Sequence, residues 1–224
     1  VGLSSKERFA TYKNKYAKPQ LIVDLGSVSQ QKLTEQISSS KDKALSKFYA
    51  HEIAEKQRRV LKSKNPTKLI REKFGFDILF SSSYRIAKSS EDFLWFRRDT
   101  EQGSVNFYIS KIKNKNKPNI NLIRDSISKK FIPGPIEKTH MSTDQGYIPK
   151  SKEFQLTESL KLTETRGIWE VKNQFMAGPF INHMVAYKNN PEELYILEGF
   201  VYSPGTTKRD YIFELEAIFK SIKF

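Results

Sequence analysis

One histidine in the sequence lies among groups that could transfer protons. His140 stands in the same stretch as Glu137 and Asp144, and the hydroxyl of Ser142 is two residues away. A histidine held by a carboxylate beside a hydroxyl could act as a general acid or base in a hydrolytic site. Spacing within one loop does not fix such geometry, and the chain has no G-x-S-x-G nucleophile elbow. An ordinary loop histidine is therefore favoured, and a hydrolase using His140 with a nearby carboxylate is the alternative.

A second histidine begins a motif that falls one residue short of a zinc site. The run HEIAE at residues 51–55 has glutamate where a zinc-protease helix needs its second imidazole. The chain has no cysteine to bind a metal or act as a nucleophile, and no phosphate-binding glycine motif. We therefore expect no metal, no cofactor and no catalytic residue, which argues against an enzyme.

Two irregular stretches of the sequence have the features of binding loops rather than of catalytic sites. Residues 131–149 hold three prolines and two glycines without a sustained period, and FMAGPF at residues 175–180 forms a second punctuated turn. Long irregular loops in compact domains tend to carry function, and apolar side chains in them are candidates for contact with a partner. His140, Met176 and Phe180 are therefore predicted binding residues.

Aromatic and basic residues are interleaved in FLWFRR at residues 93–98, a pattern also found in nucleic-acid binders. The alternation of a strand places Phe93, Trp95 and Arg97 on one face, which is equally a core face ending at a sheet edge. Trp95 and Arg97 join the candidate binding residues. A solvated basic face, or attraction to an anionic envelope surface, is favoured over specific nucleic-acid recognition.

The net charge of +14 is unevenly distributed along the chain. Residues 1–75 carry 17 Lys and Arg against 7 acids, whereas residues 151–224 carry 9 against 10. Polyanion or nucleic-acid binding through the basic N-terminal third is thus a further alternative, and its affinity would fall steeply with salt.

The elements that must position these residues are clearest at the C-terminus. Residues 180–187 and 194–202 predict two strands of a hairpin, with Pro191 in the connecting loop and Glu198 facing solvent or a polar partner. A helix follows, with a threonine N-cap in the run Thr206-Thr207-Lys208-Arg209-Asp210, and its apolar stripe must pack on the hairpin. That stripe consists of Tyr211, Ile212, Leu215, Ile218, Phe219 and Ile222.

The rest of the chain predicts antiparallel strands with covering helices. Expected strands lie at 20–25, 76–81, 84–87, 93–98 and 105–112, and the last two should pair antiparallel across the turn Gln102-Gly103. Residues 153–164 alternate as a further strand that leads towards Trp169. Helices are expected at 29–38 after a Ser27 or Ser29 cap, at 41–62, and at 67–74 between a Thr67 cap and the terminating Gly75. Asn119 should cap a further helix. The fold class is therefore α+β, an antiparallel sheet with helices on one face, with two β-β-α halves as a possible internal repeat.

Three segments make up one expected globular unit. Residues 1–75 supply a strand and basic helices, residues 76–150 strands, a helix and the long loop, and residues 151–224 the hairpin and closing helix. No stretch is long and apolar enough to predict a membrane helix, and the opening VGLSSKERFA is not a signal peptide.

Four stretches of the sequence form a distinctive set, namely RDSISKKFIPGP, RGIWEVK, FMAGPF and EGFVYSPGTTKRDYIFELEAIFKSIK, supported by YAKPQLIVDL and DFLWFRR. Together they resemble a Bacteroidota family whose members carry a domain of unknown function and are taken to be cell-envelope lipoproteins. The resemblance covers most of the chain, with Ala177 standing where the family has glycine. Family members have a further N-terminal portion with a lipidated cysteine, so this chain resembles the later part.

The resemblance implies a location in the periplasm or outer membrane through an N-terminal lipid anchor that this chain lacks. It implies no reaction, cofactor or catalytic residue. Together with the composition, it favours a non-enzymatic envelope domain that binds a protein or glycan partner through residues 131–149 and 176–180.

Overall fold

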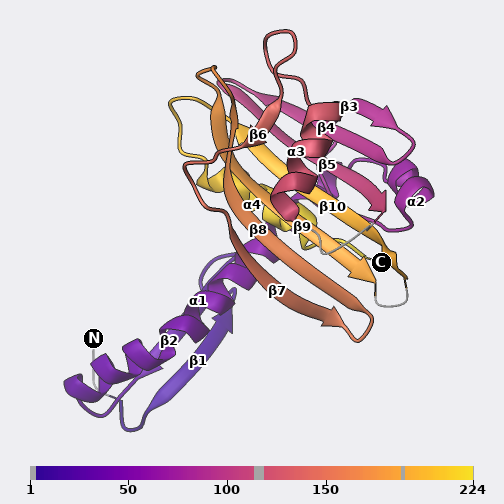
Figure 1. Ribbon diagram of the computed structural model, residues 1–224. Helices are drawn as coiled ribbons and strands as arrows, with labels where there is room; N and C mark the ends of the chain where they lie inside the picture. The colour runs from indigo at the N-terminus through magenta and orange to yellow at the C-terminus, as the bar shows by residue number, and fades with distance from the viewer. Residues whose placement is uncertain (1–3, 114–118, 188–189, 224) are drawn as a thin grey trace. The chain divides into compact units, whose positions relative to one another are not determined.

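A computed structural model describes residues 4–113, 119–187 and 190–223. The chain forms two compact units, residues 1–59 and 60–224, which we describe separately (Figure 1). None of the described helices has the length and hydropathy needed to cross a membrane.

The N-terminal unit is a two-stranded ribbon followed by a long helix. Strands β1 (Arg8–Lys13) and β2 (Leu21–Gly26) pair antiparallel, and α1 runs from Gln30 to Val60. The strand predicted at residues 20–25 is confirmed, whereas β1 was not predicted. The Ser29 hydroxyl accepts from the Lys32 amide and caps α1, as expected from the sequence.

The two helices predicted at 29–38 and 41–62 are one continuous helix. No proline or glycine lies between them, and the hydroxyls of Thr34 and Ser38 donate back to the carbonyls of Gln30 and Thr34. These bonds occupy hydroxyl groups that could otherwise have competed for backbone hydrogen bonds and ended the helix.

The C-terminal unit opens with the turn η1 (Leu61–Ser63) and the short helix α2 (Lys68–Phe74). Gly75 ends α2 with a positive φ of 77°, as predicted. Thr67 precedes the helix but does not cap it through its side chain, because its hydroxyl donates to Asp77 Oδ1 at 2.9 Å.

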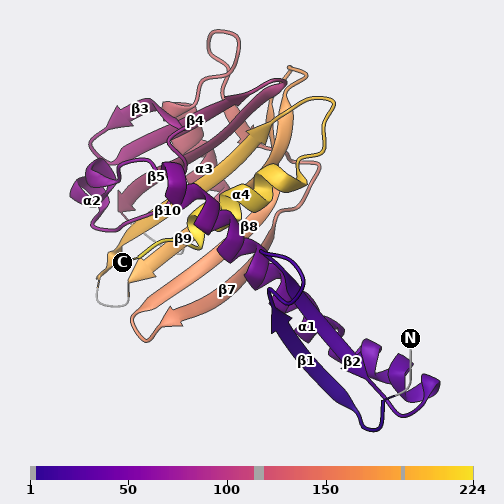
Figure 2. The ribbon, with the colours of Figure 1, turned by 180° about the vertical axis from the view of Figure 1, so that it is seen from behind.

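An eight-stranded antiparallel sheet dominates this unit, with strand order β3-β4-β5-β10-β9-β8-β6 and β7 also paired with β8 (Figures 1 and 2). Its strands are β3 (Arg85–Ser90), β4 (Phe93–Thr100), β5 (Gly103–Lys113), β6 (Met141–Thr143), β7 (Lys150–Thr157), β8 (Leu160–Val171), β9 (Ala177–Tyr187) and β10 (Asn190–Tyr202). The predicted α+β class with an antiparallel sheet is confirmed, as are the β4–β5 and β9–β10 pairings.

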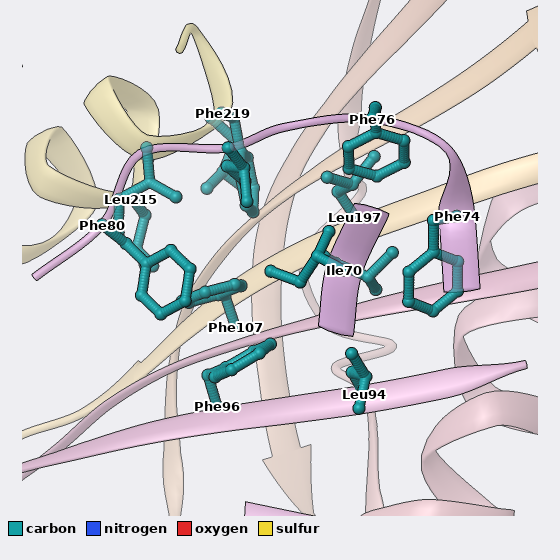
Figure 3. Close-up of a cluster of buried hydrophobic side chains, with 14 of the residues drawn as sticks. Ile70, Phe74, Phe76, Phe80, Leu94, Phe96, Phe107, Leu197, Leu215 and Phe219 are labelled. Carbon is teal, nitrogen blue, oxygen red and sulfur yellow. The ribbon is translucent and has the colours of Figure 1, made fainter. Parts of the chain in front are cut away.

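Two details of the predicted strands are wrong. Pro191 lies within β10, near its start, where the pairing with β9 shifts register between Asn190 and Leu194. Proline is tolerated at such irregular strand starts. Residues 76–81 alternate in burial as predicted but form only isolated bridges to Lys223 and Lys64. They run as an extended segment across the core (Figure 3).

One face of the sheet carries the larger hydrophobic cluster. Helix α4 (Arg209–Phe219), α2 and the extended segment cover it, and Figure 3 shows Phe80, Phe96 and Phe107 packed together beside Leu215 and Phe219. The predicted stripe of α4 is confirmed, since its members are buried in or packed against this cluster. A Cβ at Gly199 would lie 2.8 Å from Leu215 Cδ1, so β10 needs glycine where α4 crosses it.

The predicted cap of α4 is wrong. The N-cap residue is Lys208, and the hydroxyl of Thr206 bonds to Ser203 in the preceding turn instead.

The opposite face is covered by α3 (Ile120–Phe131), so helices lie on both faces rather than on one. Asn119 caps α3 as predicted, accepting from the amides of Asn121 and Leu122. Neighbouring residues such as Ile196 and Leu197 belong to the two different clusters, as the strand pleat requires.

A buried ion pair joins α3 to the middle of this face. Arg124 Nε and Nη2 donate to the two Glu198 oxygens at 2.6 and 2.8 Å, and both residues have 0% exposure. Asn182 Nδ2 and the Tyr108 hydroxyl also donate to Glu198, at 2.9 and 3.2 Å, and Arg124 bonds to the Thr143 hydroxyl. Glu198 therefore faces a polar partner within the same unit, Arg124, and not solvent.

Replacing Arg124 with Met should destabilise the C-terminal unit by about 3–5 kcal/mol, because Glu198 would remain buried without its counter-charge. Urea unfolding followed by fluorescence measures this difference. The double variant R124M/E198L should recover most of the loss. A double variant as unstable as R124M would contradict the assignment of the cost to the unpaired carboxylate.

Candidate functional site

A pocket of about 870 Å³ lies in the C-terminal unit. It is bounded by the β7–β8 hairpin, by β9 and by the C-terminal end of α4. Its lining residues are Phe154, Leu156, Thr157, Ser159, Leu160, Leu162, Glu164, His183, Val185, Phe219, Lys220 and Ile222.

The pairing of β8 with β9 builds the floor. Leu162 lies opposite Val185 and Glu164 lies opposite His183, so the pleat directs these side chains to the face that α4 covers. Helix α4 ends at Phe219, which lines the pocket together with Lys220 and Ile222 of the segment that follows. The floor that β8 and β9 supply is apolar and largely buried.

Strand β7 forms the rim. Phe154 lies opposite Leu162 and points to the same face, and Leu156 follows two residues later. Their exposures are 43% and 49%, although both are large apolar side chains. Contact with a ligand would remove this surface from water.

Charged groups close the other end of the pocket. His183 Nε2 lies 3.0 Å from Glu164 Oε2, and Arg166 Nε donates to Glu164 Oε1 at 2.8 Å. Arg166 also pairs with Glu216 of α4. Burial alone would raise the pKa of Glu164, but the bonds from His183 and Arg166 outweigh it and lower the pKa from 4.5 to about 2.

This charged cluster suits recognition better than proton transfer. A carboxylate with a pKa of about 2 is a poor general base near neutral pH. His183 is 5% exposed and its ring centre lies 5.1 Å from that of Phe219. Among the described residues, no three His, Cys, Asp or Glu side chains gather to hold a metal ion.

Trp95 and Arg97 lie on the α3 face of β4, as the alternation predicts. Trp95 Nε1 donates to Asn106 at 3.1 Å, and its ring packs against Phe200 in the smaller cluster. Arg97 is partly exposed and pairs with Asp99 at 2.7 Å. Neither residue lines the pocket.

Met176 and Phe180 also belong to the α3 face. Phe180 is 1% exposed, and the Arg124 guanidinium lies 3.7 Å from its ring centre, which is a cation–π contact. Met176 packs against the same cluster. The neighbouring Phe175, which was not predicted as a binding residue, is fully exposed.

His140 pairs through its backbone with Pro133 and is half-buried. In the described part of the chain, its side chain makes no hydrogen bond with Glu137 or Asp144. Asp144 Oδ1 instead accepts from the Gly146 amide at 2.7 Å, and Glu137 is exposed. The structure thus does not join these residues into a catalytic group.

The pocket itself was not predicted from the sequence. Nothing in the local sequence marks Glu164 or His183 as a site residue, because neither belongs to a motif. The available signal was the pair of large apolar residues, Phe154 and Leu156, in the otherwise polar run KSKEFQLT. Which face they share with Val185 and Phe219 depends on strand pairing between distant segments.

The C-terminal unit is therefore an α+β domain with an antiparallel sheet and an apolar pocket at one end of it. The chain belongs to the family defined by the domain of unknown function DUF4837, whose model matches residues 63–221. A second domain of unknown function, DUF8532, matches residues 1–61. The expected membership of a family that carries a domain of unknown function is confirmed.

Comparison with functionally curated proteins found no significant match. Among solved structures, the Ran-binding protein Mog1p of Saccharomyces cerevisiae is similar, with 6% identity and a TM-score of 0.40. The similarity covers 67% of this chain and 91% of Mog1p. A score this low bears on neither the site nor the function of this chain.

Replacing Glu164 with Gln should lower the stability of the C-terminal unit at neutral pH by on the order of 2 kcal/mol. The lowered folded-state pKa means that this stabilisation is present above about pH 4.5 and is lost as the pH falls towards 2. Urea unfolding of both proteins between pH 7 and pH 2.5 measures the difference. A gap that stays constant over this range would contradict the proposed role of the charge.

Proposed function

We propose that the C-terminal unit is a non-enzymatic binding module that takes an apolar chain or side chain into the pocket beside β7. The proposal rests on one contrast within the pocket. Its apolar floor is buried, whereas the two large apolar residues at its rim, Phe154 and Leu156, are exposed. Exposed apolar side chains at the mouth of a concave site favour a ligand that covers them.

The size and charge of the pocket support a particular kind of ligand. A volume of about 870 Å³ falls within the range of small-molecule sites. The carboxylate of Glu164 is already neutralised by Arg166 and His183. The pocket therefore suits an elongated, uncharged apolar group that carries one hydrogen-bonding atom at its Glu164 end.

The proposal extends to where the protein acts. The family motifs support the proposal that the protein is a cell-envelope lipoprotein of Bacteroidota. It would be held by an N-terminal lipid anchor and would bind a protein or glycan partner. In fractionated cells, the full-length protein should sediment with membranes and be released by detergent but not by high salt. Recovery in the soluble cytoplasmic fraction would contradict this location.

The two alternatives raised by the sequence have less support. A hydrolase would need His140 to meet Glu137 or Asp144, and the described side chains make no such bond. Polyanion binding rests on the excess of Lys and Arg in residues 1–75 alone. Both remain predictions.

Replacing Leu156 with Asp should weaken binding of the uncharged fluorophore N-phenyl-1-naphthylamine by about tenfold or more, because a charge would then stand at the apolar mouth. Ile86→Asp is the matched control, since Ile86 lies on the other edge strand with the same 49% exposure. Fluorescence titration measures both affinities, and thermal unfolding checks that both variants fold.

Equal loss of affinity in the two variants, or none in either, would place the fluorophore outside the pocket and contradict the proposal.

A further inference from the structure

Strand β7 presents a free edge of the sheet. In the described part of the chain it pairs with β8 alone, and all eight of its residues are exposed. Residues 150–155 pair with β8 without a register shift. The outward backbone amides and carbonyls of such a strand are a ready template for another strand.

The opposite edge is protected. Strand β3 has a register shift in its middle, between Ile86 and Lys88. Bulges of this kind twist an edge away from further pairing. Strand β7 has its own register shift only near its end, between Gln155 and Thr157, so its regular run over residues 150–155 is the more open edge.

The side chains of β7 on the pocket face divide into two chemical halves. Lys150 and Lys152 lie opposite Arg166 and Glu164, and Phe154 follows on the same face. Leu156 lies at the register shift between Gln155 and Thr157, and its side chain lines the pocket. The described structure gives neither lysine an ion-pair partner. On the other face, Glu153 is paired with Lys161 at 2.9 Å.

We propose that β7 pairs antiparallel with an extended segment of a partner protein whose alternate residues read apolar, apolar, acidic, acidic from its N-terminus. Antiparallel alignment continues the pattern of every pair in this sheet. It sets the two apolar residues against Leu156 and Phe154, and the two acidic residues against Lys152 and Lys150. Backbone bonds supply affinity and these side-chain pairs supply selectivity.

Charge complementarity distinguishes this partner from a second copy of the chain. The pocket face of β7 carries no acidic residue, so pairing between two β7 strands would leave all four lysines without a counter-charge. The residues that select the partner, Lys150 and Lys152, do not line the pocket. The edge site shares Phe154 and Leu156 with the ligand pocket, but its charge selectivity depends on residues outside the pocket.

A charge-swap experiment tests the proposal. The probes are two peptides, Ile-Thr-Val-Thr-Glu-Thr-Glu-Thr and its counterpart with Lys for both Glu residues. The full chain should bind the acidic peptide, with amide NMR shifts confined to β7 and β8. The variant K150E/K152E should bind it about fivefold or more weakly and should prefer the basic peptide. The charge-matched control K129E/K172E, with both changes at exposed lysines outside β7, should behave as the parent chain.

Four results would overturn the proposal. One is no binding of either peptide, another is shifts located away from β7 and β8, and the third is an unchanged peptide preference in K150E/K152E. Self-association that this variant abolishes would identify a second copy as the occupant and would also overturn it. The variant should still bind N-phenyl-1-naphthylamine as the parent does, so failure of the edge site is distinguishable from failure of the pocket.

Discussion

The ion pair between Arg124 and Glu198 is the constraint on which the α3 side of the sheet depends. Both groups have no solvent exposure, and removing two charges from water costs several kcal/mol for each ion. That cost is offset only when every oxygen and nitrogen is well placed. Glu198 therefore draws together β5 through Tyr108, β9 through Asn182 and α3 through Arg124, while Thr143 brings β6 to the same group.

Strands β6 and β7 both pair with β8, at different parts of its length. The short strand β6 pairs with residues 169–171 of β8, and β7 pairs with residues 160–166 of the same strand. One long strand thus supports two partners in succession. The pocket lies between the β7–β8 hairpin, β9 and the end of α4 at Phe219.

Two acidic residues on neighbouring parts of the sheet follow the same electrostatic rule. Glu198 is neutralised by Arg124 on one face, and on the other face Glu164 pairs with Arg166 and bonds to His183. The first pair is buried in the core and joins α3 to the sheet. The second lies at a wall of the pocket.

The sequence by itself determined the fold class and part of the local structure. The two faces of β4, the glycine after α2, the Asn119 cap and the apolar stripe of α4 each depend on neighbouring residues, and these four predictions were confirmed. Only the tertiary structure decided which distant residues meet. Phe180 and Trp95, chosen as binding residues, pack on the α3 face, whereas Glu164, His183 and Phe154 converge at the pocket. The reason is physical: strand register and helix placement depend on long-range contacts that no short stretch of sequence encodes.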